Sequence, residues 1–185
     1  VLPGMQAAFV DIGLERAAFI HAADIATVDE NGMESRTDNV PDIRKLVYES
    51  KSLIVQVIKD PIGSKGARLT THLSVSSRFL VYMPYTNHIG ISQKIESEAE
   101  RERLRTIVEQ CLPADNREQA GGFIVRTVAE NAELEDIQTD ALFLQKLWGD
   151  LKPGLGSFNV PNVIYNDLPL FIRTMRDAVK PGVDK

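Results

Sequence analysis

The chain has 185 residues, of which 43% are apolar and 25% charged, with a formal net charge of −5 and a single cysteine. This composition suits a globular protein with one or two hydrophobic cores and argues against nonspecific coating of nucleic acid. It excludes an internal disulfide, and no segment approaches the roughly 20 apolar residues of a membrane-spanning helix. Because the chain opens on Val1 with no signal peptide, we interpret it as a fragment of a longer cytoplasmic protein.

The first 72 residues alternate short apolar runs with turn residues, which predicts strands. The predicted strands cover residues 6–11, 16–21, 53–58 and 67–71. A short amphipathic helix is expected over 41–49, with Pro41 at its start. Several short strands and one inserted helix predict a small Greek-key barrel.

Phe9 and Phe19 lie on the first two predicted strands, joined by a turn at 11–13. Such a hairpin places aromatic rings side by side for bases to stack on, so RNA is the first partner to test. The alternative from the sequence is that both rings fill the core of the barrel.

The second part of the chain has the pattern of an α+β unit. Strands are predicted at 79–83 and 122–127 and helices at 97–112 and 133–148. A Gly/Pro-rich joint at 153–157 precedes a possible strand at 158–165 and a helix at 167–179. That last helix is expected to belong to a further domain that the fragment truncates.

Few residues have the spacing of a catalytic or metal site. His21, His72 and His88 are far apart and lie in no metal-binding or nucleophile motif, so we assign them surface or packing roles, with RNA contact as the alternative. The turn at 63–66 lacks the full spacing of a phosphate-binding loop. It either presents Lys65 to a phosphate backbone or is simply exposed to solvent.

Arg126 and Thr127 end an apolar strand. Arginine at such a position can bind phosphate oxygens with two parallel hydrogen bonds, and a threonine hydroxyl adds a neutral donor. The alternative, which composition alone favours, is a structural salt bridge for Arg126.

Six ordered motifs resemble the ribonuclease E/G family along essentially the whole chain. They are AAFVDIG at 7–13, the strand around Phe19, KDPIGSKGARLTT at 59–71, FLVYMP at 79–84, GISQKIE at 90–96 and GGFIVRT at 121–127. The run at 92–98 is more similar to the ribonuclease G branch than to ribonuclease E.

The resemblance implies a mixed fold of three parts. Residues 1–72 would form an S1-type (OB-like) β-barrel whose first strand precedes Val1 and whose edge is therefore open. Residues 73–157 would form an α+β 5′-sensor domain, and 158–185 the truncated start of an RNase H-like domain.

The resemblance also implies roles for single residues in the S1-type domain. Positions matching Phe9, Phe19 and Lys65 contact RNA in the family, with the rings stacked on bases. The match favours this role for the two rings over a place in the core.

In the 5′-sensor domain, the resemblance implies a pocket for the 5′-monophosphate of the RNA. Arg126 would clamp the phosphate, Thr127 would donate its hydroxyl, and backbone near Ser77 and Val81 would shape the pocket. The sequence departs from ribonuclease E at two positions. The first is Ser77, which stands where that enzyme has glycine.

The second departure is Gln93, which stands where ribonuclease E has an arginine close to the pocket. Lys94 could supply compensating charge. Both residues are therefore possible pocket contacts.

For the full-length protein, the resemblance implies an endoribonuclease that cleaves single-stranded RNA, especially 5′-monophosphorylated RNA, in rRNA maturation and RNA decay. It also implies a catalytic Mg²⁺, and a cysteine-bound Zn²⁺ that joins dimers into tetramers. Neither site can be matched to these 185 residues, so we expect this chain to bind RNA without cutting it and to hold no metal.

Two other classes stay open. One is a noncatalytic RNA-binding or translation-associated protein that shares the S1-like barrel, since fold does not fix function. The other is a protein-interaction scaffold with Phe9 and Phe19 in its core, which would bind no RNA.

Overall fold

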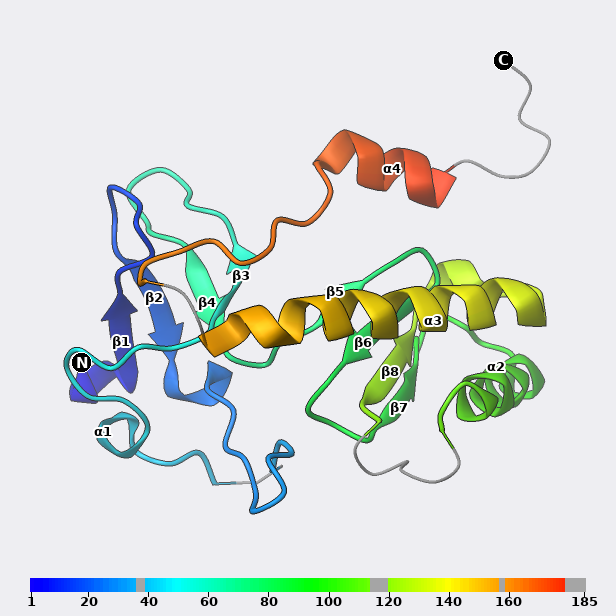
Figure 1. Ribbon diagram of the computed structural model, residues 1–185, viewed down its shortest axis with the longest axis horizontal. Coiled ribbons are helices and arrows are strands. Elements are labelled where there is room, and N and C mark those ends of the chain that lie inside the picture. Colours follow the sequence, from blue (N-terminus) through cyan, green and yellow to red (C-terminus); the bar gives the residue numbers. More distant parts are fainter. Residues whose placement is uncertain (36–38, 114–119, 157–158, 179–185) are drawn as a thin grey trace. The chain divides into compact units, whose positions relative to one another are not determined.

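The computed structural model describes residues 1–35, 39–113, 120–156 and 159–178. Contacts divide the chain into two compact units, Val1–Leu73 with Pro153–Asn162, and Ser74–Lys152 with Val163–Lys185. Each unit contains one four-stranded mixed sheet (Figure 1). The division at 1–72, 73–157 and 158–185 stays a prediction, because clusters of contacts do not test which segments fold independently.

The sheet of the first unit contains four short strands. Their order across the sheet is β1 (Ala7–Val10), β2 (Ala18–His21), β4 (Arg68–Thr70) and β3 (Gln56–Lys59). β1–β2 and β3–β4 pair antiparallel, whereas β2 and β4 pair parallel. All four predicted strands are thus confirmed. The predicted barrel is corrected to an open sheet, because among the described residues no pairing joins the two edge strands, β1 and β3.

Short helices complete this unit: η1 (Pro3–Met5), η2 (Ala22–Asp24) and α1 (Ile43–Leu46). The predicted helix at 41–49 is confirmed as α1, but it begins after Pro41, because Asp42 accepts a hydrogen bond from the Arg44 amide at 2.9 Å and caps it. The core consists of alanine and branched aliphatic side chains: Ala8, Ala18, Ile20, Ala22, Ile43, Val47, Ala67 and Leu69.

The sheet of the second unit also has four strands. Their order is β5 (Val75–Ser76), β6 (Leu80–Met83), β8 (Gly122–Val125) and β7 (Ile89–Ile91). β6 pairs antiparallel with β5 and β8, and β7 pairs parallel with β8. β6 and β8 confirm the predicted strands; β5 and β7 did not stand out in the sequence.

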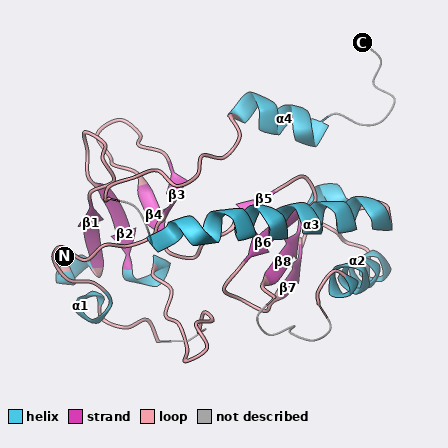
Figure 2. Ribbon diagram, viewed as in Figure 1, coloured by secondary structure: helices cyan, strands magenta, loops and turns pink. Residues whose placement is uncertain are grey.

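Two long helices pack on this sheet (Figure 2), α2 (Glu98–Gln110) against β7 and α3 (Leu134–Leu151) against β5 and β6. Their buried faces carry Leu104, Ile107, Val108, Ile137, Ala141, Leu144 and Trp148. The short helix η4 (Thr127–Ala129) follows β8, and η5 (Lys152–Gly156) follows α3. Both long helices were predicted.

The last described helix is α4 (Leu170–Ala178), which confirms a helix within the expected range 167–179. It begins three residues later than expected, and Val179 lies outside the described residues. The expected strand at 158–165 is wrong for residues 159–165, which form no strand. Pro161 lies within this segment, and proline lacks the amide hydrogen that a strand ladder needs. Phe158 is outside the described residues.

Candidate nucleic-acid interface

A row of three residues crosses the first sheet. Phe9 pairs with Phe19, and Phe19 pairs with Arg68. Residues that alternate with this row along the strands, such as Ala8, face the core. Because side chains alternate between the faces of a strand, the row lies on the face of the sheet away from the core.

Phe9 and Phe19 form an aromatic pair on this outer face. The Phe9 side chain is 61% exposed and Phe19 is half-buried, and the ring centroids lie 6.1 Å apart in an edge-on arrangement. Phe9 therefore lies outside the hydrophobic core, contrary to the alternative that the sequence left open.

Arg68 continues the row with a cation that is held in place. Its guanidinium forms an ion pair with Asp24 at 2.9 Å. Lys59, which pairs with Arg68 beyond a register shift in β3, is also exposed. The outer face thus offers aromatic surface beside positive charge, the combination that binds single-stranded nucleic acid.

Lys65 lies in a tight hairpin turn. The Ile62 and Lys65 backbones exchange hydrogen bonds of 3.2 and 3.0 Å around Gly63, whose φ of +56° is in the left-handed region that glycine tolerates. The Arg16 guanidinium donates to the Gly63 carbonyl oxygen. Lys65 itself is exposed, so a hairpin turn is confirmed and its role in RNA contact stays a prediction.

In the second unit, Arg126 follows β8 and its guanidinium is held from two sides. Nη1 donates to the carbonyl oxygens of Ser77 at 2.5 Å and Arg78 at 2.8 Å. On the other side, Asp177 of α4 accepts from Nη2 at 2.7 Å and from Nη1 at 3.3 Å. The salt bridge that the sequence left as the alternative is therefore present, and its geometry is that of a bidentate anion contact.

The turn between β5 and β6 is organised by Asp140 of α3. One carboxylate oxygen accepts from the Ser77 hydroxyl at 2.5 Å and from the amides of Phe79 and Leu80, both at 2.9 Å. Ser77 is buried. Asp140 therefore fixes the segment whose carbonyl groups hold Arg126.

Thr127 lies against a different segment from Arg126. Its hydroxyl is 2.8 Å from the hydroxyl of Ser92, which also accepts from the Lys94 amide at 3.4 Å. Gln93 and Lys94 are exposed. The structure thus brings Thr127 together with the segment that carries Gln93 and Lys94.

Val81 is half-buried in the middle of β6, where it pairs with Ser76 and Ile124. Ser77 follows Ser76 in the chain, and its carbonyl oxygen accepts from Arg126. Val81 is therefore linked to the Arg126 site through the neighbouring strand β5.

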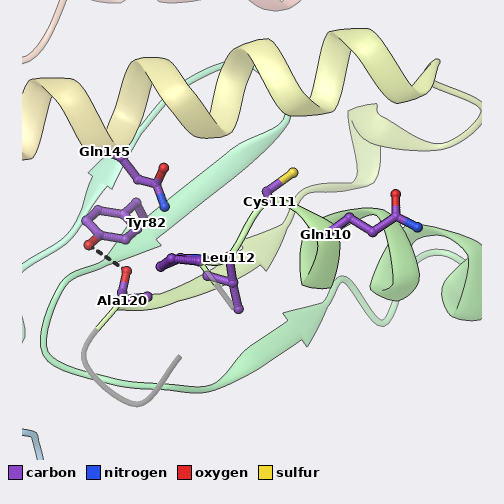
Figure 3. Close-up of a pocket in the computed structure, with 7 residues that line it drawn as sticks. Tyr82, Gln110, Cys111, Leu112, Ala120 and Gln145 are labelled. Atoms are coloured by element: carbon purple, nitrogen blue, oxygen red, sulfur yellow. Dashed lines mark hydrogen bonds between the residues drawn. The ribbon is translucent and has the colours of Figure 1, made fainter. Parts of the chain in front are cut away.

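A pocket elsewhere in this unit contains none of the predicted residues (Figure 3). It is lined by Tyr82, Gln110, Cys111, Leu112, Pro113, Ala120 and Gln145. The Tyr82 hydroxyl donates to the Ala120 carbonyl oxygen at 2.9 Å. Burial raises the pKa of the Cys111 thiol, which makes it a weak nucleophile. These described lining residues carry no positive charge for a phosphate.

Among the described residues, no group of three or more His, Cys, Asp or Glu side chains is placed to hold a metal ion. No described helix is both long and apolar enough to cross a membrane.

Sequence reasoning missed residues near these sites, among them Arg68, Ser92, Asp140, Arg176 and Asp177. Each acts through a partner distant in the chain, such as Arg126 for Asp177. The only local signal was the basic Arg68 between the apolar residues Ala67 and Leu69 of a predicted strand.

The sequence pattern of the Ribonuclease E/G family matches residues 74–185. This chain belongs to the ribonuclease E/G family, which confirms the resemblance carried by the six motifs.

Among curated relatives, the whole chain is 46% identical to ribonuclease G of Haemophilus influenzae and 45% identical to ribonuclease G of Escherichia coli K12. It is 36% identical to ribonuclease E of a Nostoc species. The higher identity to ribonuclease G agrees with the branch expected from the motifs. The chain spans 37% of the length of the ribonuclease G relatives and 26% of the Nostoc protein.

Proposed function

We propose that this chain is the RNA-binding and 5′-monophosphate-sensing part of an endoribonuclease similar to ribonuclease G. The observation that carries this proposal is the Arg126 site, where two carbonyl groups hold a guanidinium that already binds a carboxylate with both oxygens. A terminal phosphate offers the same paired oxygens with a charge of about −1.5 to −2 at neutral pH, so it binds such a fork more strongly.

The other predicted pocket residues complete this proposed site. Thr127 supplies a hydroxyl donor, and the backbone at Ser77 and Val81 supports the wall beside Arg126. Gln93 and Lys94 supply polar and positive groups next to Thr127. The support for these roles is the position of the residues around β6 and β8.

The first unit is proposed to be an S1-type RNA-binding domain that binds the single-stranded chain. Phe9 and Phe19 stack on bases, and Lys65 contacts phosphate. The support is the exposed aromatic pair in a row that continues into Arg68. Stacking of this kind contributes about 1–3 kcal/mol per base.

For the whole protein we propose cleavage of single-stranded RNA in rRNA maturation and RNA decay, in the cytoplasm, by a homodimer or homotetramer. The 158–185 segment would begin its RNase H-like domain. A 5′ end held in one module and single strand held in another raise the local concentration of the cleavage site, which links sensing to cutting.

Mg²⁺ for catalysis and Zn²⁺ between subunits belong to this proposal for the whole protein only. The described residues do not fit either ion, because they contain no cluster of three or more potential ligands. No step that we assign to this chain therefore involves a metal.

The proposal is tested by Arg126→Ala, measured as binding of a short single-stranded RNA with a 5′-monophosphate or a 5′-hydroxyl. We expect the monophosphate form to lose roughly tenfold to a hundredfold in affinity, because a charge-assisted bidentate contact contributes about 1.5–3 kcal/mol. The hydroxyl form should be almost unaffected.

Arg105→Ala is the matched control, because Arg105 lies on α2 and its contacts with the described residues are long, 3.4 Å to the Ile89 carbonyl oxygen and 3.9 Å to the Glu102 carboxylate. It should retain the preference for monophosphate. An equal loss on both RNAs in Arg126→Ala would count against a 5′-sensor at this site.

A further inference from the structure

Asp177 bridges two arginines at the Arg126 site. Besides its two contacts with Arg126, its Oδ1 accepts from Nε of Arg176 at 2.9 Å. One carboxylate thus occupies a position that two guanidinium groups share, and these three side chains carry a net positive charge.

The two arginines do not depend on Asp177 alone for their positions. Arg126 is bonded to the Ser77 and Arg78 carbonyl oxygens, and Arg176 Nη1 donates to the Ser76 carbonyl oxygen at 3.4 Å. The Arg176 side chain is also largely buried, with 19% exposed. A rotation of the Asp177 side chain would therefore free both guanidinium groups while the backbone at 76–78 still holds them.

An anion that replaces the Asp177 carboxylate would contact both arginines. A phosphomonoester carries more negative charge than the carboxylate and has three oxygens for the available N–H groups. The exchange thus favours a terminal phosphate over the internal carboxylate, but the ligand must first displace Asp177 and is weakened by that competition.

We infer that the 5′-phosphate takes the place of the Asp177 carboxylate, so that Arg176 is a second phosphate-binding residue and Asp177 is an internal competitor for the site. This inference rests on the proposed function of Arg126. It assigns to α4 a direct part in reading the 5′ end of RNA.

The test is Asp177→Asn in the 185-residue chain, with the same 5′-monophosphate and 5′-hydroxyl RNAs. Asparagine keeps the size of the side chain and removes the competing charge. We expect roughly threefold to tenfold tighter binding of the monophosphate RNA and unchanged binding of the hydroxyl RNA. Asp167→Asn is the matched control, because Asp167 pairs with Arg173 in the same segment at 3.3 Å and should leave both affinities unchanged.

A second variant, Arg176→Ala, tests the other half of the inference. It should weaken binding of the monophosphate RNA by roughly tenfold, whereas Arg173→Ala on the same helix should not. One outcome is that the wild-type chain prefers monophosphate RNA while Asp177→Asn leaves that preference unchanged or weakens it. Asp177 then only positions Arg126, and the inference is overturned while the proposed function stands. If wild type and both variants show no preference for monophosphate, the proposed function fails with it.

Discussion

The exposure of Phe9 distinguishes a role of its ring in RNA binding from a role in packing the core. Its ring is 61% exposed and touches Phe19 edge-on, so Phe9→Ala should change the free energy of unfolding by less than about 1 kcal/mol. Loss of a stacked base should weaken binding of single-stranded RNA by about 1–3 kcal/mol. Denaturant unfolding and RNA titration of the same variant measure the two effects.

Phe143→Ala is the control for this experiment, because Phe143 is 56% exposed on α3 and belongs to no proposed interface. It should leave RNA affinity unchanged. A large loss of stability in Phe9→Ala, with RNA affinity intact, would restore the packing role.

His72 forms an ion pair with Glu34, with Nδ1 2.7 Å from the carboxylate. The hydrogen bond to Glu34 raises the pKa of His72 above its ordinary value. The ion pair therefore contributes fully to stability at pH values below the pKa that His72 has in the unfolded chain. This contribution is lost as the pH rises through the raised pKa of His72 in the folded protein. Because the His72 side chain is 45% exposed, the contribution should be below about 1 kcal/mol.

Glu34→Gln should accordingly lower the free energy of unfolding near pH 6 and have little effect near pH 9. Denaturant unfolding of the variant and wild type at both pH values checks this. The same difference at both values would show that the charge of His72 is not responsible.

At the scale of elements, Asp140 joins α3 to the turn between β5 and β6. Asp140→Ala would leave the amides of Phe79 and Leu80 without their acceptor and the Ser77 hydroxyl with only the Leu80 carbonyl oxygen, at 3.2 Å. We expect a loss of about 1–3 kcal/mol in the stability of the second unit. The preference for monophosphate RNA should also fall, since this turn supplies the carbonyl groups that hold Arg126. Hydrogen exchange of the β6 amides reports the first effect and RNA titration the second.

The control is Asp150→Ala, which removes an exposed carboxylate from the same helix. It should change stability by less than about 0.5 kcal/mol. If both variants behave alike, Asp140 does not organise the turn.

Most of the helices and strands were predicted from local patterns of apolar residues. The long helices α2 and α3 display apolar residues at helical spacing, and β6 and β8 are continuous apolar runs. β5 contains two residues, too few for any pattern. β7 is interrupted by Gly90, and glycine is depleted in strands. The open sheet could not be foreseen either, because strand order depends on pairings such as β2 with β4, far apart in the chain.

The candidate site was predicted in its residue types but not in its contacts. Arg126 and Thr127 stand out at the end of an apolar strand, whereas nothing local links Arg126 to Asp177. The exposure of Phe9 likewise follows from the register of β1 with β2, which decides which face each ring occupies.

At the scale of the whole chain, we propose that the first unit binds the RNA strand and that the second reads its 5′ end. The two activities should therefore separate by mutation: Phe9 affects RNA with either 5′ end, and Arg126 only RNA with a 5′-monophosphate. The chain covers 37% of its ribonuclease G relatives, so binding is the activity to measure on it.

The most direct measurement is titration of the unmodified chain with one short single-stranded RNA that carries either a 5′-monophosphate or a 5′-hydroxyl. The salt concentration must be matched and stated, because phosphate contacts weaken as salt rises. We expect tighter binding of the monophosphate form. Equal affinity for the two RNAs, or no binding of either, would contradict the proposed function.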